Sequence, residues 1–268
     1  EPFLNALDVR DAQITFPIKT AEGKASRAQL NNLRAHVYFP PEQIYLSQAE
    51  GTFCGIRLSA RGQLIKRADY QPSASITPEE WQKRLLLAQR VVIELQKFSF
   101  PAGPPSLQLK FSGDMAELEK ARVEATLRGD RLKRGAYEVN YLSAAAEWNH
   151  QRLDIAHCEW SDGTGAFAGR GDWSRENNTA KFQIHSTLNL KGFFDAFGVG
   201  EWMKDMEFHS PPLLEITGSI KLGDEQFRPD IVGHTAFGQF RYKKVPFSEL
   251  SADFSWDGER TFVRELRV

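Results

Sequence analysis

A segment near the middle of the chain repeats a segment near its start. A constant step of 109 residues aligns residues 141–171 with residues 32–62 without a gap. The step pairs Leu33 with Leu142, Phe39 with Trp148 and Gly62 with Gly171, and a shorter third copy at 246–260 follows the second by 108 residues. Self-similarity at a fixed period is typical of arrays of one structural unit. The period predicts three units, which cover residues 1–113, 114–219 and a truncated 220–268.

Each copy contains strands in which apolar and polar residues alternate. Successive side chains of a strand point to opposite faces of its sheet, so alternation predicts one apolar and one polar face. Such strands are typical of antiparallel sheets that are covered on one side only. The expected apolar lining consists of Leu33, Ala35, Val37, Phe39, Ile44, Leu46, Leu142, Ala144, Ala146, Trp148, Leu153, Ile155, Leu250, Ala252, Phe254 and Trp256.

Turn-forming residues and glycines punctuate the strands. The segments "PPEQ", "NHQ" and "DGE" are expected to be hairpin turns, and Asp257-Gly258 is the strongest such signal. Glycines are expected in the third strand of each unit, where they indicate a strongly curved sheet. They are Gly51, Gly55, Gly62, Gly163, Gly165, Gly169 and Gly171. The alternative, a phosphate-binding loop, lacks the Lys-Ser/Thr ending of that motif.

Two stretches break the β pattern and predict helices. Residues 77–97 begin with Thr77 as N-cap, Pro78 at the first helical position and Glu80 in a capping box. A core-facing stripe is expected from Trp81, Leu85, Ala88, Val92 and Leu95, widened by Leu86, Leu87, Val91 and Ile93. Residues 190–206 predict one or two short helical turns because glycines interrupt them. Their Phe193, Phe194, Phe197, Trp202 and Met203 are expected to enter the sheet core, with a membrane-docking surface as the alternative.

These patterns together predict a mainly β protein. We expect a curved antiparallel sheet, built from repeats of about 108 residues, that forms an open apolar groove, with one amphipathic helix and a short Phe-rich helical segment. Alternation alone fits a closed sandwich core equally well.

The composition argues against several classes of partner. With 34 basic and 35 acidic residues, the chain offers no electrostatic footprint for nucleic acid or for anionic lipid head groups. It contains no apolar run near the roughly 20 residues of a membrane-spanning helix. It begins without Met or signal peptide and is expected to be part of a longer protein. Cys54 and Cys158 have no CxxC spacing, and either a bridge between them or two isolated thiols fits the pattern.

The sequence contains no motif that predicts catalysis. The six histidines form no HxxxH pair, and no GxSxG or other nucleophile motif is present. The carboxylates lie in polar, turn-like stretches that are typical of a solvated surface. We therefore expect no enzyme activity, no cofactor and no metal site.

Four segments carry a resemblance to a known family: "LSAAAEWNHQRLDIAHCEWSDGTGAFAGRG", "LRAHVYFPPEQIYLSQAEGTFCGIRLSARG", "PPLLEITGSIKL" and "VPFSELSADFSWDGER". Together they resemble the AsmA-like superfamily of bacterial envelope proteins. The resemblance covers most of the chain as a pattern of alternation and glycine placement. It implies a periplasmic body of repeating β-groove units and an inner-membrane anchor outside this chain. It also implies an apolar trough that carries phospholipid toward the outer membrane.

Physical chemistry agrees with a lipid conduit as the leading hypothesis. Exposing an acyl chain of about 16 methylenes to water costs on the order of 13 kcal/mol, so lipid needs a dry surface to cross an aqueous compartment. Two alternatives stay open. One is a scaffold that receives strands of outer-membrane proteins by β-augmentation, and the other is a passive β-sandwich binding module.

Overall fold

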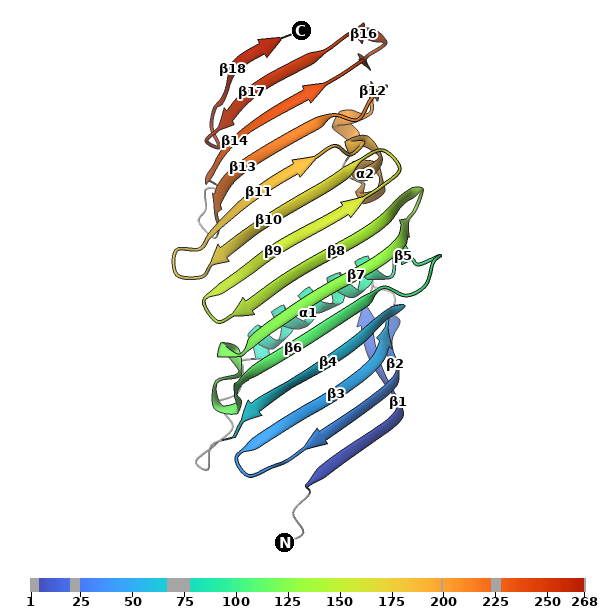
Figure 1. The fold of residues 1–268 in the computed structure, drawn as a ribbon, viewed down its shortest axis with the longest axis vertical. Helices are drawn as coiled ribbons and strands as arrows, with labels where there is room; N and C mark the ends of the chain where they lie inside the picture. The colour runs from blue at the N-terminus through green and yellow to red at the C-terminus, as the bar shows by residue number, and fades with distance from the viewer. Residues whose placement is uncertain (1–4, 20–24, 67–77, 199, 223–227, 268) are drawn as a thin grey trace. The chain divides into compact units, whose positions relative to one another are not determined.

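The protein, described here from a computed structural model, is mainly β (Figure 1). The structure describes residues 5–19, 25–66, 78–198, 200–222 and 228–267. Its strands form a 15-stranded sheet and a separate three-stranded sheet. The prediction of a mainly β, open sheet is confirmed. The chain divides into two compact units, residues 1–129 with 148–150 and residues 130–147 with 151–268, which are described separately below.

The first unit contains a sheet in the order β1-β2-β3-β4-β6-β7. Its elements are β1 (Ala6–Lys19), β2 (Ala25–Tyr38), β3 (Gln43–Phe53), β4 (Ile56–Ile65), α1 (Pro78–Leu95), β5 (Phe98–Ser99), β6 (Ser106–Asp114), the 3-10 helix η1 (Met115–Lys120) and β7 (Arg122–Arg134), which continues into the second unit. The pair β4–β6 is parallel, whereas β1 to β4 pair antiparallel, as does β6 with β7. The expectation of antiparallel pairing fails at β4–β6 because the α1 crossover returns the chain in the same direction.

The second unit contains the strand order β8-β9-β10-β11-β13-β14-β17-β18. Its elements are β8 (Tyr137–Asn149), β9 (Arg152–Ser161), β10 (Ala166–Ser174), β11 (Thr179–Ser186), α2 (Leu190–Phe197), the 3-10 helix η2 (Glu201–Met203), β12 (Met206–Phe208), β13 (Leu213–Lys221), β14 (Arg228–Phe237), β15 (Phe240–Tyr242), β16 (Val245–Phe247), β17 (Leu250–Trp256) and β18 (Thr261–Arg267). The short strands β12, β15 and β16 form the three-stranded sheet, which Phe208, Phe240 and Phe247 join through ring contacts.

The predicted helix and the predicted Phe-rich segment are both present. Helix α1 spans nearly the expected range, although the proposed cap Thr77 lies outside the described residues. Its Val92 is buried against Ala28 and Phe53. Leu86 and Val91 are 57% and 52% exposed, so the prediction that they widen the buried stripe is wrong.

Helix α2 is short because its ends are both capped. Asn189 accepts a hydrogen bond from the Lys191 amide at its start, and Gly198 ends it in the left-handed conformation. Phe193 and Phe194 are partly buried and Met203 is fully buried, as expected for core residues. Phe197 remains 41% exposed because it lies in the last turn, and the side chain of Trp202 lies outside the described residues. In Figure 1, α2 lies behind the strands of its unit.

Glycines in the strands lie on the apolar face, opposite large side chains of neighbouring strands. A Cβ added to Gly233 would lie 2.6 Å from the Phe254 ring and 2.8 Å from the Glu215 carbonyl oxygen. The third strand of the repeated segment is β4 in the first copy and β10 in the second, and it contains Gly62, Gly169 and Gly171 as predicted. The prediction is wrong for Gly51, which lies in the preceding strand β3, and for Gly55, Gly163 and Gly165, which lie in turns. Gly55, Gly163 and Gly165 serve turn geometry, which the sequence pattern did not separate from strand glycines.

Replacing Gly233 with alanine should destabilise the second unit by about 1–3 kcal/mol, because the added methyl group overpacks the contact with Phe254. Chemical denaturation of the two proteins measures the difference. The matched control is Gly163→Ala, since a Cβ at that position would meet nothing within 4 Å. Equal stabilities of the two variants would contradict this account of the strand glycines.

Candidate functional site

The first unit has a continuous apolar face. Strand pairing places Val37 beside Leu46, Leu46 beside Gly62 and Gly62 beside Phe111. Phe111 in turn lies beside Val123 of β7. Paired residues of adjacent strands point to the same side of a sheet, so one row of apolar positions crosses five strands. The residues between them along each strand, such as Arg61 and Lys110, point to the other face.

The second unit repeats the arrangement. Two cross-strand rows on its apolar face run from β9 to β17. The first consists of Ile155, Gly171, Phe182, Gly218, Ile231 and Trp256, and the second consists of Cys158, Gly169, Ile184, Ile216, Gly233 and Phe254. Each row contains two glycines, and each of these glycines lies between larger side chains. This arrangement gives the neighbouring large side chains room over the glycines and keeps the face apolar throughout.

The structure places fifteen of the sixteen predicted lining residues in strands β2, β3, β8, β9 and β17. Leu33, Ala35, Val37, Ile44 and Leu46 share the apolar face of the first unit, and Phe39 directly follows β2. In the second unit Leu153 and Ile155 alternate in β9, and Leu250, Ala252, Phe254 and Trp256 alternate in β17. The remaining predicted residues Leu142, Ala144, Ala146 and Trp148 alternate along β8.

Sequence reasoning missed the apolar residues of β4 and of the strands between the repeated segments. They are Leu58, Ala60, Leu64, Leu107, Leu109, Phe111, Val123, Ala125 and Leu127 in the first unit, and Phe182, Ile184, Leu214, Ile216, Ile220 and Ile231 in the second. The sequence contained the signal that could have found them, because apolar and polar residues alternate with period two in "SLQLKFSG" and "LLEITGSIK".

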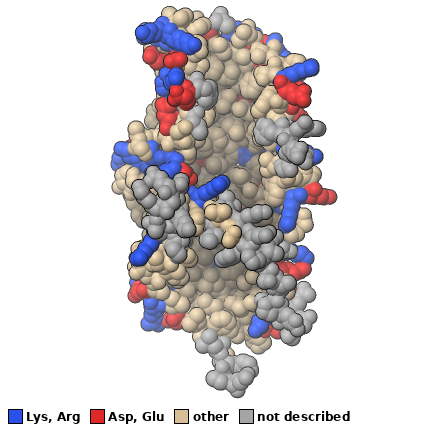
Figure 2. Space-filling view, turned by 180° about the vertical axis from the view of Figure 1, so that it is seen from behind, with Lys and Arg blue, Asp and Glu red and all other residues tan. Residues whose placement is uncertain are grey.

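The apolar faces are accessible. Of the sixteen predicted residues, only Ala35 and Ala252 are buried, at 8% exposure each, and the others are half-buried. Within each unit, the described strands include no second layer of comparable size over this face. In Figure 2 the face seen from behind is hollowed and mostly uncharged, and Lys, Arg, Asp and Glu lie mainly toward its borders. The sandwich interpretation required a sealed interior, which neither unit has among its described residues.

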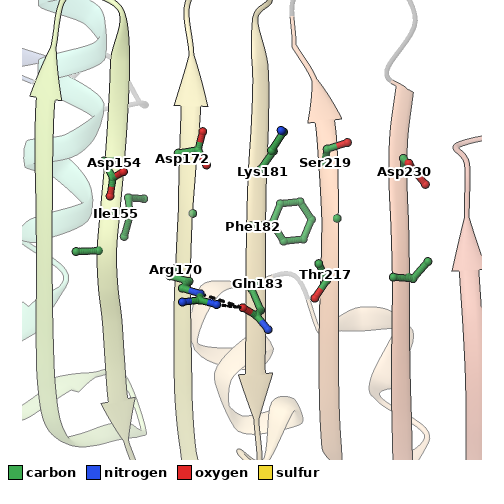
Figure 3. Close-up of a pocket in the computed structure, with 14 residues that line it drawn as sticks. Asp154, Ile155, Arg170, Asp172, Lys181, Phe182, Gln183, Thr217, Ser219 and Asp230 are labelled. Atoms are coloured by element: carbon green, nitrogen blue, oxygen red, sulfur yellow. Dashed lines mark hydrogen bonds between the residues drawn. The ribbon is translucent and has the colours of Figure 1, made fainter.

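The polar face of the second unit carries a depression of about 640 Å³ (Figure 3). Arg170 donates to the Gln183 side-chain oxygen at 2.9 and 2.7 Å. Arg152 lies 3.2 Å from Asp154 and 3.6 Å from Asp172. These polar groups pair with one another, Arg152 with Asp154 in the same strand and with Asp172 in the next, and the depression is shallow and open to water. Its chemistry is that of a solvated sheet surface, so the apolar face is the better candidate for a ligand.

The described residues include a contact between a serine and a histidine side chain, Ser143 Oγ to His157 Nε2 at 3.1 Å. Ser143 is 5% exposed, so no substrate carbonyl reaches its hydroxyl. His157 lines a second depression on the polar face, and its contact with Ser143 places the neighbours Leu142 and Ala144 on the apolar face. Among the described residues no group of three or more His, Cys, Asp or Glu side chains is arranged to hold a metal ion.

The two cysteines are free thiols in the structure, and they belong to different units. Burial raises the pKa of both thiols, and the nearby Glu159 carboxylate adds to the effect at Cys158. The raised pKa keeps both groups in the neutral, less reactive form.

An aromatic cluster lies at the α2 end of the second unit's apolar face. The Trp160 ring stacks on Phe167 at 3.8 Å and on Phe193 at 5.6 Å between centroids. Tyr137 meets Phe193 edge-on at 5.9 Å. Burial raises the pKa of the Tyr137 hydroxyl above its ordinary value, a nearby hydrogen-bonding group of Trp160 partly offsets this, and the Asp162 carboxylate raises it further. Tyr137 therefore stays protonated well above neutral pH.

No family model, no curated protein and no solved structure matches the chain. Among the helices of the described residues, none combines the length and apolar character needed to cross a membrane.

Replacing Tyr137 with phenylalanine should leave the native tyrosine titration near pH 11 unchanged, whereas in denaturant it should remove one titrating group. The pKa of Tyr137 is higher in the folded than in the unfolded protein. Protonated Tyr137 therefore stabilises the folded protein fully below about pH 10, and this stabilisation is lost as the pH rises above that value. Absorbance at alkaline pH measures both states. A native amplitude that falls by one tyrosine in Tyr137→Phe would contradict the burial of this hydroxyl.

Proposed function

We propose that the chain binds lipid acyl chains on the apolar faces of its units and is a segment of a periplasmic lipid-transfer conduit between the inner and outer membranes. The ligand class is phospholipid. The resemblance to the AsmA-like superfamily supports the location and the inner-membrane anchor in a longer parent protein. The accessible apolar face supports the ligand class.

One observation carries the proposal: apolar rows cross the strands of each unit on a face whose side chains are only partly buried. An apolar surface of this extent is unfavourable in water unless a ligand or partner covers it. Strands of nine or ten residues, such as β13 and β14, are about 30 Å long at roughly 3.3 Å per residue. That length accommodates a lipid tail, and the lining residues make only non-directional contacts.

The same contacts explain how a lipid could move without covalent chemistry. Each buried methylene group of a tail contributes about 0.8 kcal/mol wherever it lies on a uniform apolar surface. A tail that slides from one row to the next exchanges equivalent contacts, so its free energy changes little along the face. Charged residues toward the borders leave the head group in contact with water.

Photocrosslinking tests which face contacts lipid. A photoreactive residue in place of Phe254 or Leu109 should capture phospholipid during expression in cells with a periplasm, because both positions lie on apolar faces. The matched controls are Asp253 and Lys110, the adjacent residues on the polar face. Mass spectrometry identifies the adducts.

Native mass spectrometry of the gently purified protein supplies an independent measurement. We expect bound phospholipid in the native protein and at least a ten-fold lower occupancy in Phe254→Asp, because burying a carboxylate beside the tail is unfavourable. An apo spectrum, together with equal crosslinking from both faces, would overturn the proposal.

A further inference from the structure

The polar face of the first unit carries an exposed pair of tyrosines. Tyr38 of β2 and Tyr45 of β3 are cross-strand partners, and their rings stack at 6.4 Å between centroids with 30° between the ring planes. The two residues are 47% and 42% exposed. Tyrosine is a large and stiff side chain with an apolar ring, so a stacked pair that stays open to water offers a contact surface to a ligand.

A depression of about 350 Å³ adjoins the tyrosine pair. Tyr45 lines it, whereas Tyr38 lies one strand farther away and supports the Tyr45 ring from behind. The strand register continues this row from Tyr45 to Gln63, Ser112 and Arg122, which also line the depression. The depression therefore has an aromatic wall beside a row of polar side chains. Its volume lies at the small end of the roughly 300–1,000 Å³ that ligand sites occupy.

Basic side chains predominate around this depression. Arg61, Lys110 and Arg122 line it together with one acidic residue, Glu124. The Glu124 carboxylate lies 3.7 Å from Lys110 Nζ and 3.3 Å from an Arg122 guanidinium nitrogen. Arg61 is exposed and forms no ion pair with any residue that the structure describes. A free guanidinium with two further cations nearby favours a carboxylate, which it can bind through two parallel hydrogen bonds.

The second copy of the repeated segment differs at the same place. The 109-residue step aligns Tyr38 with Glu147 and Tyr45 with Asp154. The depression that Asp154 lines has three acidic and two basic residues around it, whereas the depression beside Tyr45 has one acidic and three basic residues. The repeated strands thus form without tyrosines or excess positive charge at these positions. Both features are specific to the first unit, as expected for a binding site.

We propose that this depression binds a saccharide whose rings carry carboxylate groups. A sugar ring has an apolar side that suits the Tyr45 wall, and its hydroxyl groups suit Gln63 and Ser112. The carboxylate accepts hydrogen bonds from Arg61. An acidic peptide would use the cations but not the wall. The site lies on the opposite face from the apolar rows, so the inference is independent of the proposed lipid function.

Calorimetric titration with three ligands tests the site. They are tetragalacturonate, a chain of four carboxylate-bearing sugar rings, the neutral saccharide maltotetraose and the acidic peptide tetraglutamate. We expect tetragalacturonate to bind most tightly. Tyr45→Ala should weaken both saccharides by about five- to ten-fold and leave tetraglutamate unchanged. Arg61→Gln should weaken the two acidic ligands by a similar factor and leave maltotetraose unchanged.

Asp154→Ala is the matched control, because Asp154 occupies the position of Tyr45 in the second copy. This replacement should change the affinity for none of the three ligands. Arg61→Gln alters an exposed side chain without an ion-pair partner among the described residues, so it tests the site even if Tyr45→Ala destabilises the sheet.

A native protein that fails to bind tetragalacturonate would overturn the proposal. Equal affinities for tetragalacturonate and tetraglutamate, both indifferent to Tyr45→Ala, would also overturn it and would identify a site for acidic peptides. Neither result bears on lipid binding, because the crosslinking positions Phe254 and Leu109 lie on the apolar faces.

Discussion

Cross-strand packing on one face of a sheet is the interaction on which this structure depends. Each apolar side chain contacts neighbours from adjacent strands, and glycines such as Gly171, Gly218 and Gly233 give the large residues space. Few side chains of the described residues are fully buried, because each unit has one large sheet and only small elements against it. Stability therefore comes from many half-buried contacts along the strands, and the same contacts leave an apolar surface accessible.

Much of this arrangement could be predicted from the sequence because a strand alternates with period two. The apolar set Leu250, Ala252, Phe254 and Trp256 of β17 lies on one face as expected, and α1 and α2 occupy nearly their expected ranges. The errors have physical causes. Leu86 and Val91 of α1 are apolar and exposed, and helical periodicity alone does not say which part of a broad apolar stripe meets the sheet.

The cluster of Tyr137, Trp160 and Phe193 could not be predicted for a different reason. Its members come from β8, β9 and α2, and their proximity depends on strand pairing and on where α2 folds back. The two faces of the second unit also differ in a way that composition hides. On the polar face, polar side chains pair across strands, as Arg152 does with Asp172 and Arg170 with Gln183, whereas the other face carries the apolar rows.

The parallel pair β4–β6 has a consequence for how the first unit folds. Strands β1 to β4 are joined in turn by short connections, whereas 40 residues separate the end of β4 at Ile65 from the start of β6 at Ser106. Closing so long a loop lowers the chain entropy before the β4–β6 hydrogen bonds form and compensate for that loss. Hairpins on either side can form early from local contacts. The pairing of β4 with β6 across the α1 crossover is thus expected to be the slow step of folding. Until it is complete, the edge of β4 can pair with the wrong strand.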